Sequence, residues 1–186
     1  IPSVSNISGT YGAYLKKWDK RSYKDFQILP LEINLNKFNN KVYNQDGVEL
    51  LKNISGDILY VDPPYNRRQY LPNYHLLETV ARYDEPEVKG ITGVRSYDNQ
   101  KSNWCLKTKV YNELETLMKN SKFKYIILSY NSEGLMNKDK IEEIMKKYGK
   151  PETYALIEIP YRRFRSRSAN AKHSVLEYLF FIEKEV

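Results

Sequence analysis

Residues 57–65 read DILYVDPPY, an apolar run that ends in an acid, two prolines and a tyrosine. Isoleucine, leucine, tyrosine and valine in succession are typical of a buried β-strand. Pro63 and Pro64 have no backbone N–H to donate to a neighbouring strand, so the strand must end before them. The stretch therefore predicts a strand over 57–61, with Asp62 at its carboxyl end and Tyr65 just beyond.

On both sides of this strand, further apolar runs alternate with amphipathic segments. The runs that predict strands cover 41–45, 123–131, about 153–159 and 174–183. The segments that predict helices cover 46–53, about 73–83 with Asn73 as the N-cap, about 107–120, and a stripe from Ile141 to Tyr148 that Gly149 closes. Residues 84–106 contain one proline and two glycines and are predicted to form a long loop.

The order of these elements predicts the sheet. Strands that alternate with helices form parallel pairs, whereas only the loop PYRRFRSRSANAKH separates the last two strands, which favours an antiparallel pair. We therefore expect an α/β fold whose sheet is mostly parallel with one antiparallel terminal strand. Ligands bind beyond the carboxyl ends of such strands, so Asp62, residues 129–131 and Tyr161 are predicted to share one cleft.

The composition indicates a soluble, globular, basic protein. The chain has 186 residues, a formal net charge of +7 and 17 tyrosines. Positive charge together with many aromatic rings favours a polyanionic partner whose bases can stack on those rings, as in nucleic acids. Many basic proteins bind no nucleic acid, so the composition alone leaves the partner open.

Several classes of protein are disfavoured by what the sequence contains. Cys105 is the single cysteine and His75 and His173 are the two histidines, so we expect neither an internal disulfide nor a metal site. No run approaches the apolar length of a membrane span, and residues 1–12 have no signal-peptide pattern. A cytoplasmic location, at the nucleoid if the source is bacterial, is the expectation.

The four residues Asp62 to Tyr65 suit one kind of chemistry. Asp62 offers a carboxylate, and the rigid prolines can aim a backbone carbonyl into the same cleft, which makes two hydrogen-bond acceptors. An exocyclic base amine has two donors, and Tyr65 could stack on the ring that carries it. Accepting both hydrogens frees the amine lone pair to attack an electrophilic methyl group, and Asp62 would stabilise the positive charge that develops. An ordinary proline turn that stops the strand is the alternative.

Longer runs of the chain resemble a known family. YGAYLKKW, DILYVDPPYNRRQY, NYHLLETVARYDEP, KYIILSYNSEG and YRRFR are similar to the adenine-N6 DNA methyltransferases of the Dam-like group, especially the modification enzymes of restriction systems. The Asp-Pro-Pro-Tyr element alone also occurs in some RNA methyltransferases, whereas the longer runs are specific to a much smaller group of enzymes. The resemblance implies a Rossmann-like methyltransferase sheet and S-adenosyl-L-methionine as the cofactor.

The resemblance also implies roles for individual residues. Asp62 and the carbonyl of Pro63 would hold the target amine, Pro64 would complete the rigid turn, and Tyr65 would stack on the flipped adenine. Asp46 would meet the adenine ring of S-adenosylmethionine, with Pro63 beside the cofactor. A helix N-cap is the alternative for Asp46, and the two roles are compatible.

One family feature does not occur in the chain. The family carries a Phe-x-Gly-x-Gly cofactor loop on its first strand, yet the eight glycines never form Gly-x-Gly. We therefore expect the first two strands of the family sheet to be missing, with 1–40 as the tail of a target-recognition region and 41–186 as the carboxyl-terminal part of the catalytic domain. An amino-terminal segment or a partner chain would supply the rest. Three hypotheses remain open: a DNA adenine methyltransferase, an RNA base methyltransferase and an inactive DNA-binding fragment.

Basic and aromatic residues near the predicted cleft suggest contacts to double-stranded DNA. Arg67, Arg68 and Tyr70 follow the turn directly and could stabilise the extruded base or fill its vacancy. A second group lies in the arginine-rich loop and comprises Tyr161, Arg162, Arg163 and Arg165. Phosphate binding is the prediction for this loop, with a solvated surface loop as the alternative. Lys16 and Lys17 could belong to the tail of the recognition region or to a basic surface helix.

Overall fold

The computed structural model describes residues 23, 25, 29–30, 32–33, 37–90, 93–162 and 174–185. The chain divides into two compact units, which are described separately. One comprises Ile1–Tyr43 and Gln69–Lys101, and the other comprises Asn44–Arg68 and Ser102–Val186. Among the described residues, no helix combines the length and the apolar character that crossing a membrane requires.

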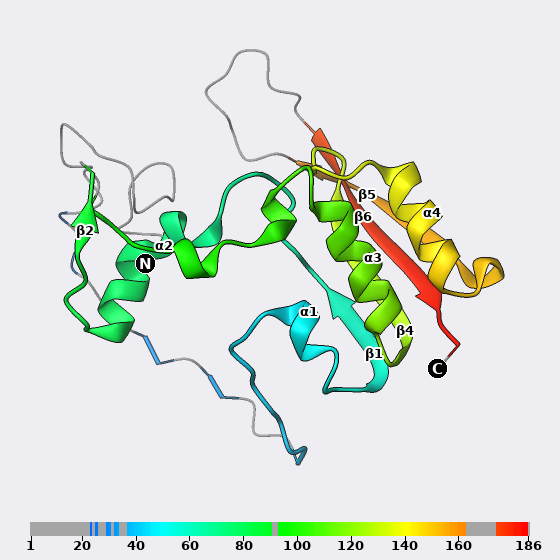
Figure 1. Cartoon of the computed structure of the whole chain (residues 1–186), viewed down its shortest axis with the longest axis horizontal. Helices are drawn as coiled ribbons and strands as arrows, with labels where there is room; N and C mark the ends of the chain where they lie inside the picture. Colours follow the sequence, from blue (N-terminus) through cyan, green and yellow to red (C-terminus); the bar gives the residue numbers. More distant parts are fainter. Residues whose placement is uncertain are drawn as a thin grey trace. The chain divides into compact units, whose positions relative to one another are not determined.

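The second unit is built on a four-stranded sheet (Figure 1). Its strands are β1 (Gly56–Val61), β4 (Phe123–Asn131), β5 (Ala155–Arg162) and β6 (Ser174–Glu183), in the order β1-β4-β6-β5. β1 and β4 pair in parallel, whereas β6 runs antiparallel to both β4 and β5. The prediction of a mostly parallel sheet with a reversed final strand is confirmed.

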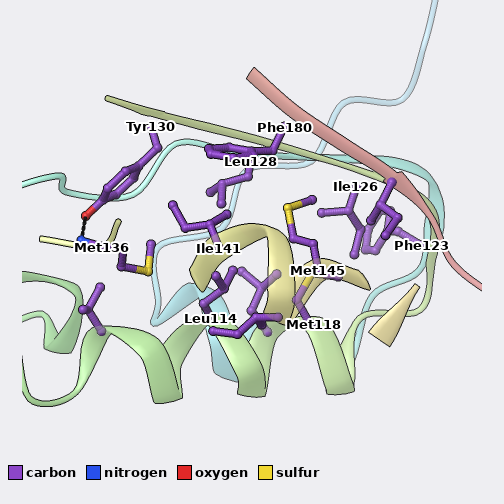
Figure 2. Close-up of a cluster of buried hydrophobic side chains, with 14 of the residues drawn as sticks. Leu114, Met118, Phe123, Ile126, Leu128, Tyr130, Met136, Ile141, Met145 and Phe180 are labelled. Atoms are coloured by element: carbon purple, nitrogen blue, oxygen red, sulfur yellow. Dashed lines mark hydrogen bonds between the residues drawn. The ribbon is translucent and has the colours of Figure 1, made fainter. Parts of the chain in front are cut away.

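Helices cover one face of this sheet. They are α1 (Gly47–Leu50), α3 (Val110–Asn120) and α4 (Lys138–Tyr148), with short 3-10 turns η3 (Asn103–Cys105) and η4 (Pro151–Thr153). Alternate residues of β4 point toward α3 and α4, as the two-residue period of a strand requires. The resulting core, part of which Figure 2 shows, includes Leu114, Met118, Ile126, Leu128, Tyr130, Ile141, Met145, Phe180 and Ile182.

The opposite face of the sheet carries apolar side chains that are exposed. Ile58 and Tyr60 of β1 are each 59% exposed, and Ile157 and Ile159 of β5 are 55% and 50% exposed. Their neighbours Leu59, between Ile58 and Tyr60, and Leu156, before Ile157, pack against the core on the other face. In this sheet, therefore, one face is packed and the other presents an apolar surface to solvent.

The first unit contains α2 (Tyr70–Arg82), the two-stranded pair β2 (Val88–Lys89) and β3 (Val94–Arg95), and the 3-10 turn η2 (Asp98–Gln100). Arg95 is buried, and its guanidinium donates two hydrogen bonds to the Asp84 carboxylate, at 2.9 and 2.5 Å. The same guanidinium approaches the hydroxyl of Thr79 on α2 at 3.4 Å. A buried charge with both partners in place ties this hairpin to the helix.

Two predictions about the elements are wrong in detail. Residues 41–45 form no strand, and Val42 is 96% exposed, because no described strand lies beside them to complete a ladder. α2 begins at Tyr70 with Gln69 as its N-cap, and Asn73 lies inside the helix. Pro72 falls in the first turn, where a missing N–H costs no intrahelical hydrogen bond. The long loop at 84–106 contains the short elements β2, β3, η2 and η3.

Candidate active site

The Asp-Pro-Pro-Tyr turn begins where β1 ends. Val61 pairs with Leu128 of β4, so Asp62 leaves the sheet at the edge where Ser129 lies. Asp62 is exposed, Pro63 is buried and Pro64 is half-buried. The turn therefore presents a carboxylate to solvent from a backbone that its prolines and its burial hold in place.

Hydrogen bonds hold Tyr65 both at its side-chain hydroxyl and at its backbone carbonyl. Its hydroxyl donates to Oδ1 of Asp62 at 2.5 Å and lies 2.7 Å from Oγ of Ser129. Its backbone carbonyl accepts hydrogen bonds from the Tyr130 hydroxyl at 3.1 Å and from the Leu135 N–H at 2.8 Å. The ring therefore cannot move without breaking bonds at its backbone or at its hydroxyl.

Tyr130 is the buried support behind this turn. It is fully buried, and its hydroxyl also accepts the N–H of Met136 at 3.2 Å, the bond drawn in Figure 2. Its ring packs against Tyr65 with centroids 5.0 Å apart and planes tilted by 58°. Gly134 lies against the same ring, and a Cβ there would come within 2.1 Å of the Tyr130 Cε1. Gly134 therefore leaves the space that Tyr130 occupies.

Burial and neighbouring charges shift the pKa values of the ionisable groups at this end of the sheet. Burial raises the pKa of Tyr65, and the Asp62 carboxylate that accepts its hydroxyl raises it further. Glu177 of β6 pairs with Asn131 at the end of β4, and burial raises the pKa of its carboxyl, with the negative charge of Asp62 adding to the effect. The chain thus gathers two carboxylates at one sheet edge, an arrangement often found at functional sites.

The chain after Tyr65 is also anchored. Oδ1 of Asn66 accepts the N–H of Arg68 at 2.9 Å, and the carbonyl of Arg68 accepts the thiol of buried Cys105 at 3.3 Å. Burial raises the pKa of the Cys105 thiol, which suits a protonated donor. The side chains of Arg67 and Arg68 are exposed on this fixed segment.

Comparison with known proteins identifies the family. A family profile described as D12 class N6 adenine-specific DNA methyltransferase matches residues 1–144. The chain belongs to this family. It is 48% identical over 186 residues to the type II methyltransferase M.FokI of Planomicrobium okeanokoites and 43% identical over 185 residues to the type II methyltransferase M.NlaIII of Neisseria lactamica.

These alignments cover nearly all of this D12-family chain and only part of each relative. The chain is covered to 100% and 97%, whereas M.FokI and M.NlaIII are covered to 29% and 54% of their own lengths. The modification methylase StsI of Streptococcus sanguinis is 40% identical over 185 residues, with 28% of its length covered. No solved structure matches the chain significantly.

In this D12-family chain, a pocket of about 290 Å³ lies beside the turn, lined by the start of α1, the end of β1, Pro63, Pro64 and Trp104. Asp46 caps α1, because its Oδ1 accepts the N–H groups of Val48 and Glu49 at 2.9 and 3.0 Å. The N-cap alternative for Asp46 is confirmed, and its cofactor role stays a prediction. The mostly apolar lining suits an adenine ring, but it offers neither a cation nor a glycine-rich turn for a methionine carboxylate.

The other predicted site residues are distributed differently. Tyr70 begins α2 in the first unit. Tyr161 is 51% exposed near the carboxyl end of β5. That is the end of the sheet where Asp62 lies, but β4 and β6 separate β5 from β1. Arg162 ends β5. Four predicted residues lie outside the described part of the chain, namely Lys16, Lys17, Arg163 and Arg165.

The sequence gives no role to two residues of the site. Ser129 is predicted to share the cleft with Asp62 but without a function of its own, and Glu177 is not singled out. The signal for Ser129 was its position at the carboxyl end of the strongest strand, where ligand-binding groups gather. For Glu177 the available signal was an acid inside an otherwise apolar strand, LEYLFFIE.

The space beside Tyr130 gives a stability prediction. Gly134→Ala should lower the free energy of unfolding by about 1–3 kcal/mol, because the new Cβ must displace a fully buried ring. Gly47→Ala is the matched control, since nothing lies within 4 Å of a Cβ at that position. Chemical denaturation of both variants measures the difference, and equal stabilities would show that the Tyr130 ring is not tightly held.

Proposed function

We propose that the chain is the catalytic part of a site-specific DNA adenine-N6 methyltransferase of a restriction-modification system. Such an enzyme transfers a methyl group from S-adenosyl-L-methionine to an adenine flipped out of the duplex. The observation that carries the proposal is the anchored turn at the sheet edge, in which an exposed carboxylate and an aromatic ring are both held in place. Family membership and the relatives named as modification methylases support it.

In the proposed reaction, Asp62 and Pro63 bind the target amine. Oδ1 of Asp62 already accepts the Tyr65 hydroxyl, which leaves Oδ2 for one amine hydrogen and the carbonyl of Pro63 for the other. Both acceptors draw the amine away from conjugation with the base and stabilise the positive charge that develops on it. Tyr65 provides the stacking surface that keeps the base in place. S-adenosylmethionine, when bound, supplies an electrophilic methyl group.

We propose that activity requires protein beyond these 186 residues, from the same polypeptide or from a partner chain. Three observations support this: the exposed apolar face of the sheet, the pocket that suits only one end of the cofactor, and the longer relatives. The added segment would extend a Rossmann-like sheet and carry the glycine-rich loop. In this arrangement 1–40 belongs to target recognition and 41–186 to catalysis.

Double-stranded DNA is the proposed partner. Arg67 and Arg68 are exposed on the segment that directly follows the turn, which suits contacts near the extruded base. Tyr70, Tyr161, Arg162, Arg163 and Arg165 remain proposed contacts, as do Lys16 and Lys17. An RNA base is the alternative substrate, and an inactive DNA-binding fragment is the alternative for the isolated chain.

Asp62→Ala in the complete enzyme should lower methyl transfer by about 10²-fold or more, because the charge on the amine loses its main stabilisation. Affinity for duplex DNA should stay within a few-fold, since phosphate contacts dominate it. Asp57→Ala is the control, because Asp57 is an exposed acid at the opposite end of β1. Transfer of labelled methyl groups measures the effect, and near-normal turnover would remove Asp62 from the mechanism.

Replacing Arg162, Arg163 and Arg165 with alanine should weaken duplex binding and flatten its dependence on salt. Each lost phosphate contact reduces the slope of log K against log[salt] by about 0.9. A triple variant of the exposed residues Lys107, Lys119 and Lys140 makes the same change in charge elsewhere. If both triple variants show the same slope, general charge explains the effect and the loop makes no specific contact.

The 186 residues alone should bind S-adenosylmethionine poorly, and a longer protein that adds the proposed segment should bind it and methylate DNA. The reason is that a methionine carboxylate needs closely approaching backbone, which glycine permits. Calorimetry on both proteins is the measurement. Micromolar binding by the short chain, together with methyl transfer, would show that the chain is sufficient.

A further inference from the structure

Ser129 takes part in a chain of hydroxyl groups that leads to Asp62. Tyr65 gives its one phenolic proton to Oδ1 of Asp62. Since no second proton is available, Tyr65 must accept at its 2.7 Å contact with Ser129, and Ser129 is the donor there. The hydrogen bonds thus run in one direction, from serine to phenol to carboxylate, and such chains strengthen each of their members.

The three members of this chain differ in how firmly the backbone holds them. Asp62 and Tyr65 both lie beyond the last ladder residue of β1. Ser129 lies within β4, where it pairs with Leu179 of β6, while its neighbour Leu128 pairs with Val61 of β1. Ser129 is therefore the member that lies inside a strand ladder, whereas the backbone of Tyr65 is held separately by Tyr130 and Leu135. What Ser129 adds is a fixed donor for the hydroxyl end of Tyr65.

We propose that Ser129 is a positioning residue for the reaction, a role that rests on the proposed function. By donating to the Tyr65 hydroxyl, Ser129 holds the outer end of the ring on which the base stacks. Through Tyr65 it also holds Oδ1 of Asp62, so that the second carboxylate oxygen faces the target amine. Ser129 itself touches neither the base nor the methyl donor.

Kinetics of the complete enzyme test this role. Ser129→Ala should lower kcat by about tenfold, the upper range for one neutral hydrogen bond, while KM for DNA stays within about twofold. Ser129→Thr keeps the hydroxyl and should restore most of the activity. Ser55→Ala replaces an exposed serine before β1 and should leave kcat unchanged.

The decisive comparison uses Tyr65→Phe, which removes the middle hydroxyl. If Ser129 acts through that hydroxyl, Ser129→Ala should cause no further loss in the Tyr65→Phe background. An equal loss in both backgrounds would overturn the proposal, as would a Ser129→Ala enzyme with normal kcat.

Chemical denaturation separates this inference from the proposed function. The stability lost in the Ser129→Ala, Tyr65→Phe double variant should be smaller than the sum of the two single losses, whatever reaction the protein catalyses. Additive losses would overturn the hydroxyl chain. A wild-type enzyme that transfers no methyl group to adenine in duplex DNA would instead overturn the proposed function and leave the stability test intact.

Discussion

The parallel register between β1 and β4 is the constraint on which the site depends. Parallel strands end at the same edge of a sheet, and here Val61 stands opposite Leu128, so the two chains leave the ladder side by side. Two prolines prevent β1 from continuing, which forces the chain to turn at Asp62. As a result Tyr65 and Ser129, 64 positions apart in the sequence, come within hydrogen-bonding distance. A shift of one residue in this register would turn Ser129 to the other face of the sheet.

Elements whose signals are local could be predicted closely. β4 spans the predicted residues 123–131, because a nearly continuous apolar run of this length identifies a buried strand. The start of α2 was predicted too late. A proline inside a helix breaks it, whereas Pro72 lies in the first turn, where proline is tolerated. Residues 41–45 have the composition of a strand, but a strand exists only where a neighbour completes its ladder, and that is a property of the whole fold.

The same distinction applies to the site. Asp62 and Tyr65 could be proposed from the sequence because the rare four-residue motif carries its own chemistry. Ser129 and Tyr130 form hydrogen bonds to Tyr65, which only the sheet register and the turn after β1 bring near them. Gly134 is one glycine among eight, and its importance appears only with the buried ring beside it. Supporting residues of this kind have ordinary identities, so no local pattern distinguishes them.

The packing of the sheet explains how a rigid turn can occur together with a site that we propose to be incomplete. On the helical side, Tyr130 and the core anchor the backbone of Tyr65. On the other side, Ile58 and Tyr60 remain more than half exposed on the strand that leads to Asp62. Covering large side chains of this kind contributes about 1–3 kcal/mol each. The proposed additional segment would therefore gain its binding energy on the face of β1 that Ile58 and Tyr60 occupy. Binding of that segment would assemble the protein and complete the site in the same step.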